Sequence, residues 1–507
     1  MTERTAGPVR GVTDHAATGP DRPAIIAGDV TRTYGQLEHR ALRLASVLAE
    51  RGAGPGRPVA AVLPNGIEIF EVATAASMLD APFLPVNWHL RSHELAYILD
   101  DAEVAVVVGH HRTGHELEQA LEGTKSGIGL LTVGVDYEDE LQAASPLPGG
   151  DSGGAPELMF YTSGTTARPK GVVHGALADR PGRARGMEGQ VALWGWTEEE
   201  VYVMSGPAYH ASHLGWSLCS LYVGGTTVIT EQFEARSWLA EVDQHRGTRT
   251  FMVPAHFIRI LEIPEHERAA LDLTSLRLIV HAAAPCPVAV KYRMMEAFAD
   301  AEIHELYGAS EGGATKITPD EWRAKPGSVG RPWPGVEIRI LDEEGSAQPT
   351  GEAGLVYIRP AGTVRFRYRN DAEATDRAWR DDAFTVGDIG HLDGDGFLFI
   401  TDRVSDMVLW GGVNIAPREV EEVLFDHPAV VDCAVFGVHD ERDGERLEAV
   451  VQLRRPVSPD ELGEFVGQRL ARYKVPRHFE IVDEVPRDHN GKVRKRQLGQ
   501  ARAGAPE

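Results

Sequence analysis

The sequence has few cysteines, no excess of positive charge and no long hydrophobic run. Its three cysteines, Cys219, Cys286 and Cys433, lack the spacing of a metal site and are too few for a disulfide framework. A formal net charge of -24 argues against nucleic-acid and anionic-membrane partners, because both require a dense basic face. No run approaches the roughly 18 apolar residues of a membrane span, and the N-terminus lacks an apolar signal segment. We therefore expect a cytoplasmic protein with no integral membrane segment.

Short β-branched runs alternate with helical patterns along most of the chain. The runs at 103–109, 225–230 and 276–284 predict strands, and 36–52 carries the periodicity of a helix. Since 507 residues exceed one ordinary core, we expect more than one domain. The alternation predicts an α/β fold with stacked, largely parallel sheets and helices.

The pattern changes near residue 404. A helical pattern at 417–428 is followed by a strand pattern at 430–438, as in a compact α+β unit. We predict a large N-terminal domain, 1–403, and a small C-terminal domain, 404–507.

The segment "YTSGTTARPKGVVH", Tyr161 to His174, gathers hydroxyl residues, glycines and Lys170 in one short run. Small residues let many donors approach a ligand closely, and phosphate oxygens accept several donors at once. Pro169 precedes the lysine and Gly171 follows it, so the segment is not a Walker A loop. On the residues alone, a solvated turn between strands is the alternative.

The same segment resembles the phosphate loop of the adenylate-forming superfamily of acyl-CoA synthetases, adenylation domains and luciferases. The usual [YF]TSGTTGxPKGV is matched except at Ala167. Further motifs follow in the family's order, over roughly residues 20 to 500: "PAYH" ending at His210, "YGASEG" at 307–312, "GSVGRPWPG" at 327–335, "TVGDIGHLDGDGFLFITDR" at 385–403, "GGVNIAPREVE" at 411–421 and "PRDHNGK" at 486–492. The resemblance, strongest to acyl-CoA ligases, implies ATP-dependent activation of a carboxylic acid as an acyl-adenylate, then transfer to CoA.

The resemblance assigns the nucleotide site residue by residue. Tyr307 is expected to stack on adenine, and Glu311 is expected to hold Mg²⁺. Asp388, beside Arg403, is expected to accept hydrogen bonds from the ribose hydroxyls. The acids near 388 do not follow the spacing of a calcium loop. The implied nucleotide-binding residues are Thr162, Ser163, Gly164, Thr165, Thr166, Lys170, Ala284, Tyr307, Gly308, Ser310, Asp388 and Arg403.

Two catalytic steps are implied by the remaining motifs. Lys492 matches the family's catalytic lysine, although a basic run is more often solvated. In the family a mobile C-terminal domain presents this lysine in one pose and Gly411-Gly412, lining the CoA channel, in the other. Ser405 stands at the hinge, where many relatives have Asp or Lys, and His210 matches the gate to the thiol tunnel.

The acid pocket is expected to include Ser212, His213, Trp216, His281 and Ala282. Trp216 would fill much of that pocket, which favours a short, medium or compact ring acid over a long fatty chain. His213 and His281 have a second interpretation as core histidines.

Two further functions stay open. One is a freestanding enzyme that loads a carrier protein or activates another anion such as nitrite, and the other is a non-catalytic nucleotide-binding relative. Glu311 and Lys492 are both present, which disfavours the last. We expect a monomer or homodimer.

Overall fold

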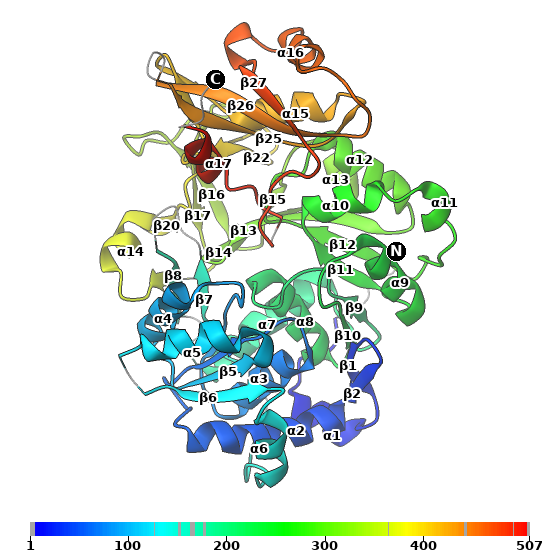
Figure 1. The fold of residues 1–507 in the computed structure, drawn as a ribbon, viewed down its shortest axis with the longest axis vertical. Coiled ribbons are helices and arrows are strands. Elements are labelled where there is room, and N and C mark those ends of the chain that lie inside the picture. The colour runs from blue at the N-terminus through cyan, green and yellow to red at the C-terminus, as the bar shows by residue number, and fades with distance from the viewer. Residues whose placement is uncertain are drawn as a thin grey trace. The chain divides into compact units, whose positions relative to one another are not determined.

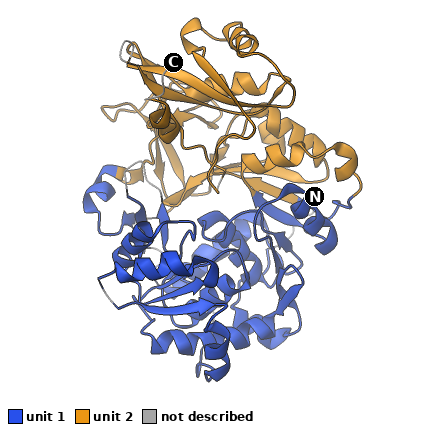
Figure 2. Ribbon diagram, viewed as in Figure 1, with its two compact units in different colours: residues 1–251, 271–277, 364–377 blue, residues 252–270, 278–363, 378–507 orange. Residues whose placement is uncertain are grey.

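The computed structural model describes residues 6–125, 127–150, 154–162, 168–175, 179–362, 365–440, 444–489 and 491–503. They fall into two compact units (Figures 1 and 2). The first comprises 1–251, 271–277 and 364–377, and the second comprises 252–270, 278–363 and 378–507. The domain boundary predicted near residue 403 lies inside the second unit, and that division stays a prediction.

Five neighbouring strands of the first unit run in the order β2-β1-β10-β9-β11, with only β2 antiparallel to its neighbour. The run expected at 225–230 is β10. Their bounds are β1 Pro23–Ala27, β2 Val30–Thr33, β9 Val201–Val203, β10 Thr226–Ile229 and β11 Arg249–Met252.

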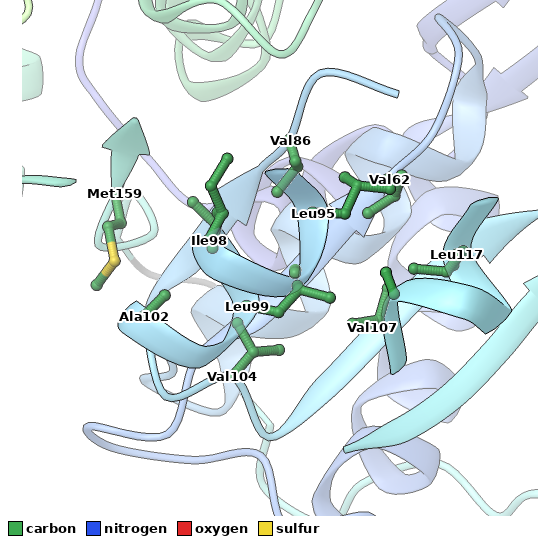
Figure 3. Packing of buried hydrophobic residues seen from close by; sticks show 13 residues of the cluster. Val62, Val86, Leu95, Ile98, Leu99, Ala102, Val104, Val107, Leu117 and Met159 are labelled. Atoms are coloured by element: carbon green, nitrogen blue, oxygen red, sulfur yellow. The ribbon is translucent and has the colours of Figure 1, made fainter. Parts of the chain in front are cut away.

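A four-stranded parallel sheet of the first unit has the order β4-β3-β5-β6. Its strands are β3 Val59–Val62, β4 Phe83–Pro85, β5 Val106–His110 and β6 Gly129–Val133. Figure 3 shows the apolar side chains packed on it, among them Leu95, Ile98 and Leu117. Residues 104–108 within the run expected at 103–109 are all buried, which explains why they are continuously apolar.

One helix of the first unit was predicted from the sequence. The helix predicted at 36–52 is α2, Tyr34–Glu50, which begins with a capping box between Thr33 and Gln36. The others are α1 Val12–Thr18, α3 Ile67–Met78, α4 Ser92–Asp101, the 3-10 turn η1 His111–Thr113, α5 Gly114–Glu122, α6 Tyr137–Ala143, α7 Arg180–Trp194, α8 Ala211–Val223, α9 Ala235–His245 and α14 Ala372–Ala378.

The second unit contains β12 and β13 in parallel, followed by antiparallel β14 and β15. A separate antiparallel sheet has the order β19-β20-β17-β21-β22, with β16 beside β17. The bounds are β12 Leu278–His281, β13 Glu302–Ala309, β14 Gly312–Ile317, β15 Arg331–Pro332, β16 Glu337–Leu341, β17 Gly354–Arg359, β19 Trp379–Arg380, β20 Ala383–Phe384, β21 Asp388–Leu392 and β22 Leu398–Arg403. Helices α10 Pro254–Leu261, α11 Glu265–Arg268, α12 Val288–Ala297 and α13 Pro319–Ala324 belong to the same unit.

The end of the chain forms a five-stranded sheet in the order β24-β23-β26-β25, with β27 beside β26. One face buries residues of α15 and α16, such as Val420 and Leu462, and the other packs against Leu498 of α17. The elements are β23 Val408–Trp410, β24 Val413–Ile415, α15 Pro417–Phe425, β25 Val430–Asp440, β26 Gly444–Leu453, α16 Pro459–Gly467, the 3-10 turn η3 Arg472–Lys474, β27 His478–Val482 and α17 Lys495–Arg502. The α/β class predicted from the sequence is confirmed.

Candidate active site

The segment expected to hold phosphate begins and ends in a small antiparallel sheet of the first unit. Strands β7, Phe160–Thr162, and β8, Lys170–His174, pair so that Thr162 lies opposite Lys170, and β18, Phe366–Tyr368, pairs with β8. The expected phosphate donors Ser163, Gly164, Thr165 and Thr166, and the mismatched Ala167, lie outside the described residues.

Side chains at the base of this segment make one cation–π contact and one hydrogen bond. The Nζ of Lys170 lies 4.8 Å from the ring centre of Tyr368, and the hydroxyl of Tyr161 donates to Asp101 at 2.6 Å. A Cβ at Gly171 would lie 2.8 Å from the Tyr161 ring. The close approach of the Tyr161 ring therefore favours glycine at position 171.

In the second unit, Tyr307, Gly308, Ser310 and Glu311 lie at the end of β13 and in the turn to β14. The β13–β14 register shifts between Tyr307 and Gly308. A Cβ at Gly308 would lie 2.8 Å from the Cα of Gly313. This close strand approach allows Ser310 and Glu311 to form a two-residue connection that exposes both side chains partly.

Asp388 joins two of the other predicted nucleotide residues. Its Oδ2 accepts a hydrogen bond from the Tyr307 hydroxyl at 2.7 Å, and its Oδ1 accepts one from Nε of Arg403 at 3.0 Å. Asp388 is buried at the start of β21, directly opposite Arg403 on β22. Burial and then the Asp388 carboxylate raise the pKa of Tyr307 well above its usual value, so the tyrosine stays a donor. Sequence reasoning missed this bond, which joins residues 81 positions apart.

Lys492 lies in the electrostatic field of the same cluster. Burial, and then the guanidinium of Arg403, lower the pKa of Lys492, while the carboxylates of Asp488, Asp388 and Glu311 oppose the shift. The carboxylates of the predicted ribose ligand and of the predicted metal ligand thus both act on the charge of the predicted lysine, and all three residues belong to the second unit. A lysine whose positive charge is not fully balanced by neighbouring carboxylates is typical of a site that binds an anionic ligand.

The backbone before Lys492 is closely packed. Gly491 has φ +72°, and a Cβ there would lie 2.8 Å from Cβ of Ala255 and 3.1 Å from a methyl group of Val253. Both the conformation and the lack of space require glycine at this position.

Gly411 and Gly412 form the two-residue turn between β23 and β24. Their φ angles are +54° and +85°, as in a type I′ hairpin, and a Cβ at either would meet no atom within 4 Å. The turn conformation thus explains the glycines here, and their role in a CoA channel stays a prediction. Ser405, the predicted hinge, donates from Oγ to Asp406 at 3.1 Å.

The predicted gate and part of the predicted acid pocket lie around the start of α8 in the first unit. His210 is the N-cap residue of that helix, with its ring 4.5 Å from the ring of Tyr209. Ser212 is partly exposed, and His213 is buried. Burial lowers the pKa of His213 to about 3, so its imidazole is neutral at physiological pH.

Trp216, one turn further along α8, is enclosed by other aromatic rings. Its ring centre lies 5.3 Å from those of Trp194 and Trp196 and 5.7 Å from that of Phe251. Only 6% of its surface is exposed. The indole is therefore held on several sides by other aromatic rings.

His281 ends β12 in the second unit, and Ala282 directly follows that strand. The imidazole of His281 is fully buried, packs edge-on to Phe257 at 5.0 Å, and places Nε2 3.5 Å from Glu305. Burial and then Lys291 lower the pKa of His281 well below its usual value. These contacts are those of an interior histidine, and its role in an acid pocket stays a prediction. Ala282 is also buried, and Ala284 is partly exposed.

Two kinds of feature are absent from the described residues. The described part of the chain contains no group of three or more His, Cys, Asp or Glu side chains able to hold a metal ion. None of its described helices is both long and apolar enough to cross a bilayer.

Comparison with known proteins identifies the family. Residues 12–366 match the AMP-binding enzyme family, and residues 419–492 match the AMP-binding enzyme C-terminal domain. The chain therefore belongs to the AMP-binding enzymes.

Relatives with assigned activities cover nearly the whole chain. A fatty acid–acyl-carrier-protein ligase, ScoC of Streptomyces coeruleorubidus, is 31% identical over 96% of this chain and 94% of its own. A feruloyl-CoA synthase of an Amycolatopsis species is 33% identical over 95% and 96%. Among solved structures, ATP-bound MatB of Rhodopseudomonas palustris has a TM-score of 0.84 at 28% identity, covering 97% of this chain and 99% of its own. MenE of Bacillus subtilis with its acyl-adenylate has a TM-score of 0.81 at 27% identity, covering 97% and 98%.

Proposed function

We propose that this AMP-binding enzyme activates a carboxylic acid with ATP, releases pyrophosphate and transfers the acyl group from its adenylate to the thiol of CoA. The observation that carries the proposal is the cluster of Lys492, Arg403, Asp388 and Tyr307 with Glu311 in range. Attack of a carboxylate on the α-phosphate joins two anions. The positive charge of Lys492, which neighbouring carboxylates do not fully balance, lies near the predicted ribose ligand Asp388 and can offset that negative charge. The CoA ligases among the relatives support the same reaction.

The residues divide the work of the first step. Asp388, held by Tyr307 and Arg403, offers carboxylate oxygens to the ribose hydroxyls. Lys170 offers a cation to the departing phosphates, and Lys492 stabilises charge on the attacking carboxylate and the α-phosphate. His210 gates the thiol in the second step, for which Gly411 and Gly412 leave room.

Glu311 fits a magnesium ligand. Mg²⁺ keeps several waters and takes one or two carboxylates together with substrate phosphates, so a single partly exposed glutamate suffices and a larger cluster is not needed. When bound, the ion would neutralise phosphate charge.

The substrate we propose is a short or compact acid. Trp216 is locked among Trp194, Trp196 and Phe251, so it cannot swing aside for a long chain. His213 is neutral and buried on the same helix, and a neutral imidazole suits a substrate with polarity of its own.

Pyrophosphate release over a panel of acids, with and without CoA, tests the function. Thioester formed only with CoA supports it, and no release with any acid contradicts it. Trp216→Gly should shift preference toward longer acids, and an unchanged acid preference would contradict the role of Trp216.

A carrier-protein thiol is the second candidate acceptor, because one relative of 31% identity is a fatty acid–acyl-carrier-protein ligase. Adenylate trapped as hydroxamate without CoA turnover would favour that acceptor.

A further inference from the structure

Arg487 is a buried arginine near the C-terminus that the reaction proposed above does not use. It forms a bidentate ion pair with Asp432 of β25, with Nε to Oδ2 at 2.8 Å and Nη2 to Oδ1 at 2.6 Å. Only 16% of the arginine side chain and 7% of the aspartate side chain are exposed. A paired, buried guanidinium of this kind has one geometry.

The pairing of β25 with its neighbouring strand explains how Asp432 can point toward Arg487. The pairing of β25 with β26 shifts register between Val430 and Asp432, and such an irregularity redirects a side chain. Oδ1 of Asp432 also accepts the backbone N–H of Cys433 at 2.8 Å. The carboxylate is thus fixed to the strand before it meets the arginine.

The third nitrogen of Arg487 reaches the residue before the proposed catalytic lysine. Its Nη1 donates to the carbonyl oxygen of Gly491 at 2.8 Å. Arg487 therefore connects β25, a buried strand at the edge of the C-terminal sheet, to the peptide unit that joins Gly491 to Lys492.

A second anchor acts on the lysine itself. The backbone N–H of Lys492 donates to Oδ1 of Asp488 at 3.0 Å, and the N–H of Asp488 donates to the Lys492 carbonyl at 2.9 Å. Asp488 directly follows Arg487, so fixing the arginine also fixes the residue that holds the lysine backbone.

We propose that Arg487, held by Asp432, is a positioning residue that sets the backbone of Lys492 for adenylation. The inference rests on the proposed function. A displacement of about 1 Å of a reacting group lowers a rate by about 100-fold, and Lys492 is required in the adenylation step alone. Loss of Arg487 should therefore reduce adenylation far more than thiol transfer.

The chain offers a matched control in Arg502. This arginine also pairs with a carboxylate, Glu480, with Nε to Oε2 at 3.0 Å, and it also donates to a backbone carbonyl, that of Leu498 at 3.3 Å. It belongs to α17, and among the described residues its hydrogen bonds and ion pair reach neither Gly491 nor Lys492. Arg502→Ala removes the same chemistry without touching the lysine.

The experiment measures both half-reactions in the full-length Arg487→Ala, Arg487→Lys, Asp432→Asn, Lys492→Ala and Arg502→Ala variants. Adenylation is read as ATP–pyrophosphate exchange with the preferred acid, and thiol transfer as thioester formed from the chemically made adenylate and CoA. We expect Arg487→Ala to lose about 100-fold in adenylation with thiol transfer within about 3-fold of wild type. Arg487→Lys should recover part of the loss, because one ammonium cannot keep both contacts.

Hydrogen exchange gives a second readout that needs no substrate. The amide of Lys492 should exchange faster in Arg487→Ala and Asp432→Asn and at the wild-type rate in Arg502→Ala. Equal loss of both half-reactions, loss of neither, or unchanged exchange at Lys492 in a folded variant would overturn the positioning role. If wild type releases no pyrophosphate with any acid, the proposed function fails, and the exchange rates still decide whether Arg487 positions Lys492.

Discussion

Arg40 in the first unit and Lys492 in the second are both partly buried cations, and their surroundings differ. Arg40 on α2 hydrogen-bonds to Glu71 of α3 at 2.6 and 3.1 Å and to Glu138 of α6 at 2.6 and 3.0 Å. Burial alone would lower the pKa of Arg40, and the two carboxylates reverse the shift. Lys492 has the opposite balance, with its pKa lowered by burial and by Arg403.

The difference distinguishes a cation that stabilises the fold from a cation that can bind an anionic ligand. Arg40 is neutralised by groups of its own unit, so it ties three helices together and has nothing to offer a ligand. Lys492 lies near carboxylates that do not restore its pKa, so an anionic ligand would gain from binding beside it.

The largest expected effect is that of Lys492→Ala, which removes the cation proposed to act in adenylation. Adenylation should lose on the order of 3 kcal/mol or more of transition-state stabilisation, while thioester formation from supplied adenylate stays near wild type. Single-turnover assays of each half-reaction measure the split. Equal loss in both would contradict the role of the lysine.

Removing Glu71, the buried partner of Arg40, should lower the stability of the fold and leave adenylation unchanged. Glu71→Ala leaves a partly buried guanidinium short of one carboxylate and should cost about 3 kcal/mol of unfolding free energy, measured by urea denaturation. The control is Glu138→Ala, whose side chain is 54% exposed and whose loss should cost less than about 1 kcal/mol. Similar costs for the two variants would argue against the central role of Glu71.

Tyr307→Phe keeps the ring and removes the hydrogen bond to Asp388. Hydrogen bonds to charged groups contribute about 1.5 kcal/mol or more, so the KM for ATP should rise about 10-fold. Steady-state kinetics at saturating acid measure the change. Tyr34→Phe is the control, since its buried hydroxyl donates to two carbonyls of the first unit and its loss should lower stability only. An unchanged KM in Tyr307→Phe would show that Asp388 needs no support from Tyr307.

The smallest effect concerns pH. Because the folded pKa of Lys492 lies below 10.5, the folded protein loses this proton at a lower pH than the unfolded chain does. Adenylation should therefore fall as pH rises through the folded pKa, while the contribution of Lys492 to stability rises over the same range. Rates of pyrophosphate release from pH 7 to 10, with folding monitored, test this. Residual activity of Lys492→Arg should show no such alkaline fall, and an equal fall would assign it to another group.

Motifs located much of this from the sequence. The segments "YGASEG", "VGDIG" and "HNGK" led to Tyr307, Asp388 and Lys492, which the second unit brings within range of one another. Strand positions were also close, as for β10 at Thr226–Ile229 against an expected 225–230. Both rest on local signals, since apolar periodicity and short motifs are properties of neighbouring residues.

What could not be predicted depends on distant contacts. No pattern indicates that the Tyr307 hydroxyl donates to a carboxylate 81 residues away. Likewise, alternate side chains of a strand face opposite ways, and the sequence cannot decide which way His281 points. The structure places it beside Phe257 and Glu305. The ion pair between Arg487 and Asp432 joins residues 55 positions apart and gives no signal either.

The backbone position of Lys492 depends on the small space available at the preceding residue, Gly491. A Cβ at residue 491 would lie 2.8 Å from Cβ of Ala255 and 3.1 Å from a methyl carbon of Val253, closer than side chains normally pack. Gly491→Ala would therefore force the backbone beside Lys492 or its neighbours to shift without altering any charge. The position of the proposed catalytic cation thus depends on the absence of a side chain at the residue before it.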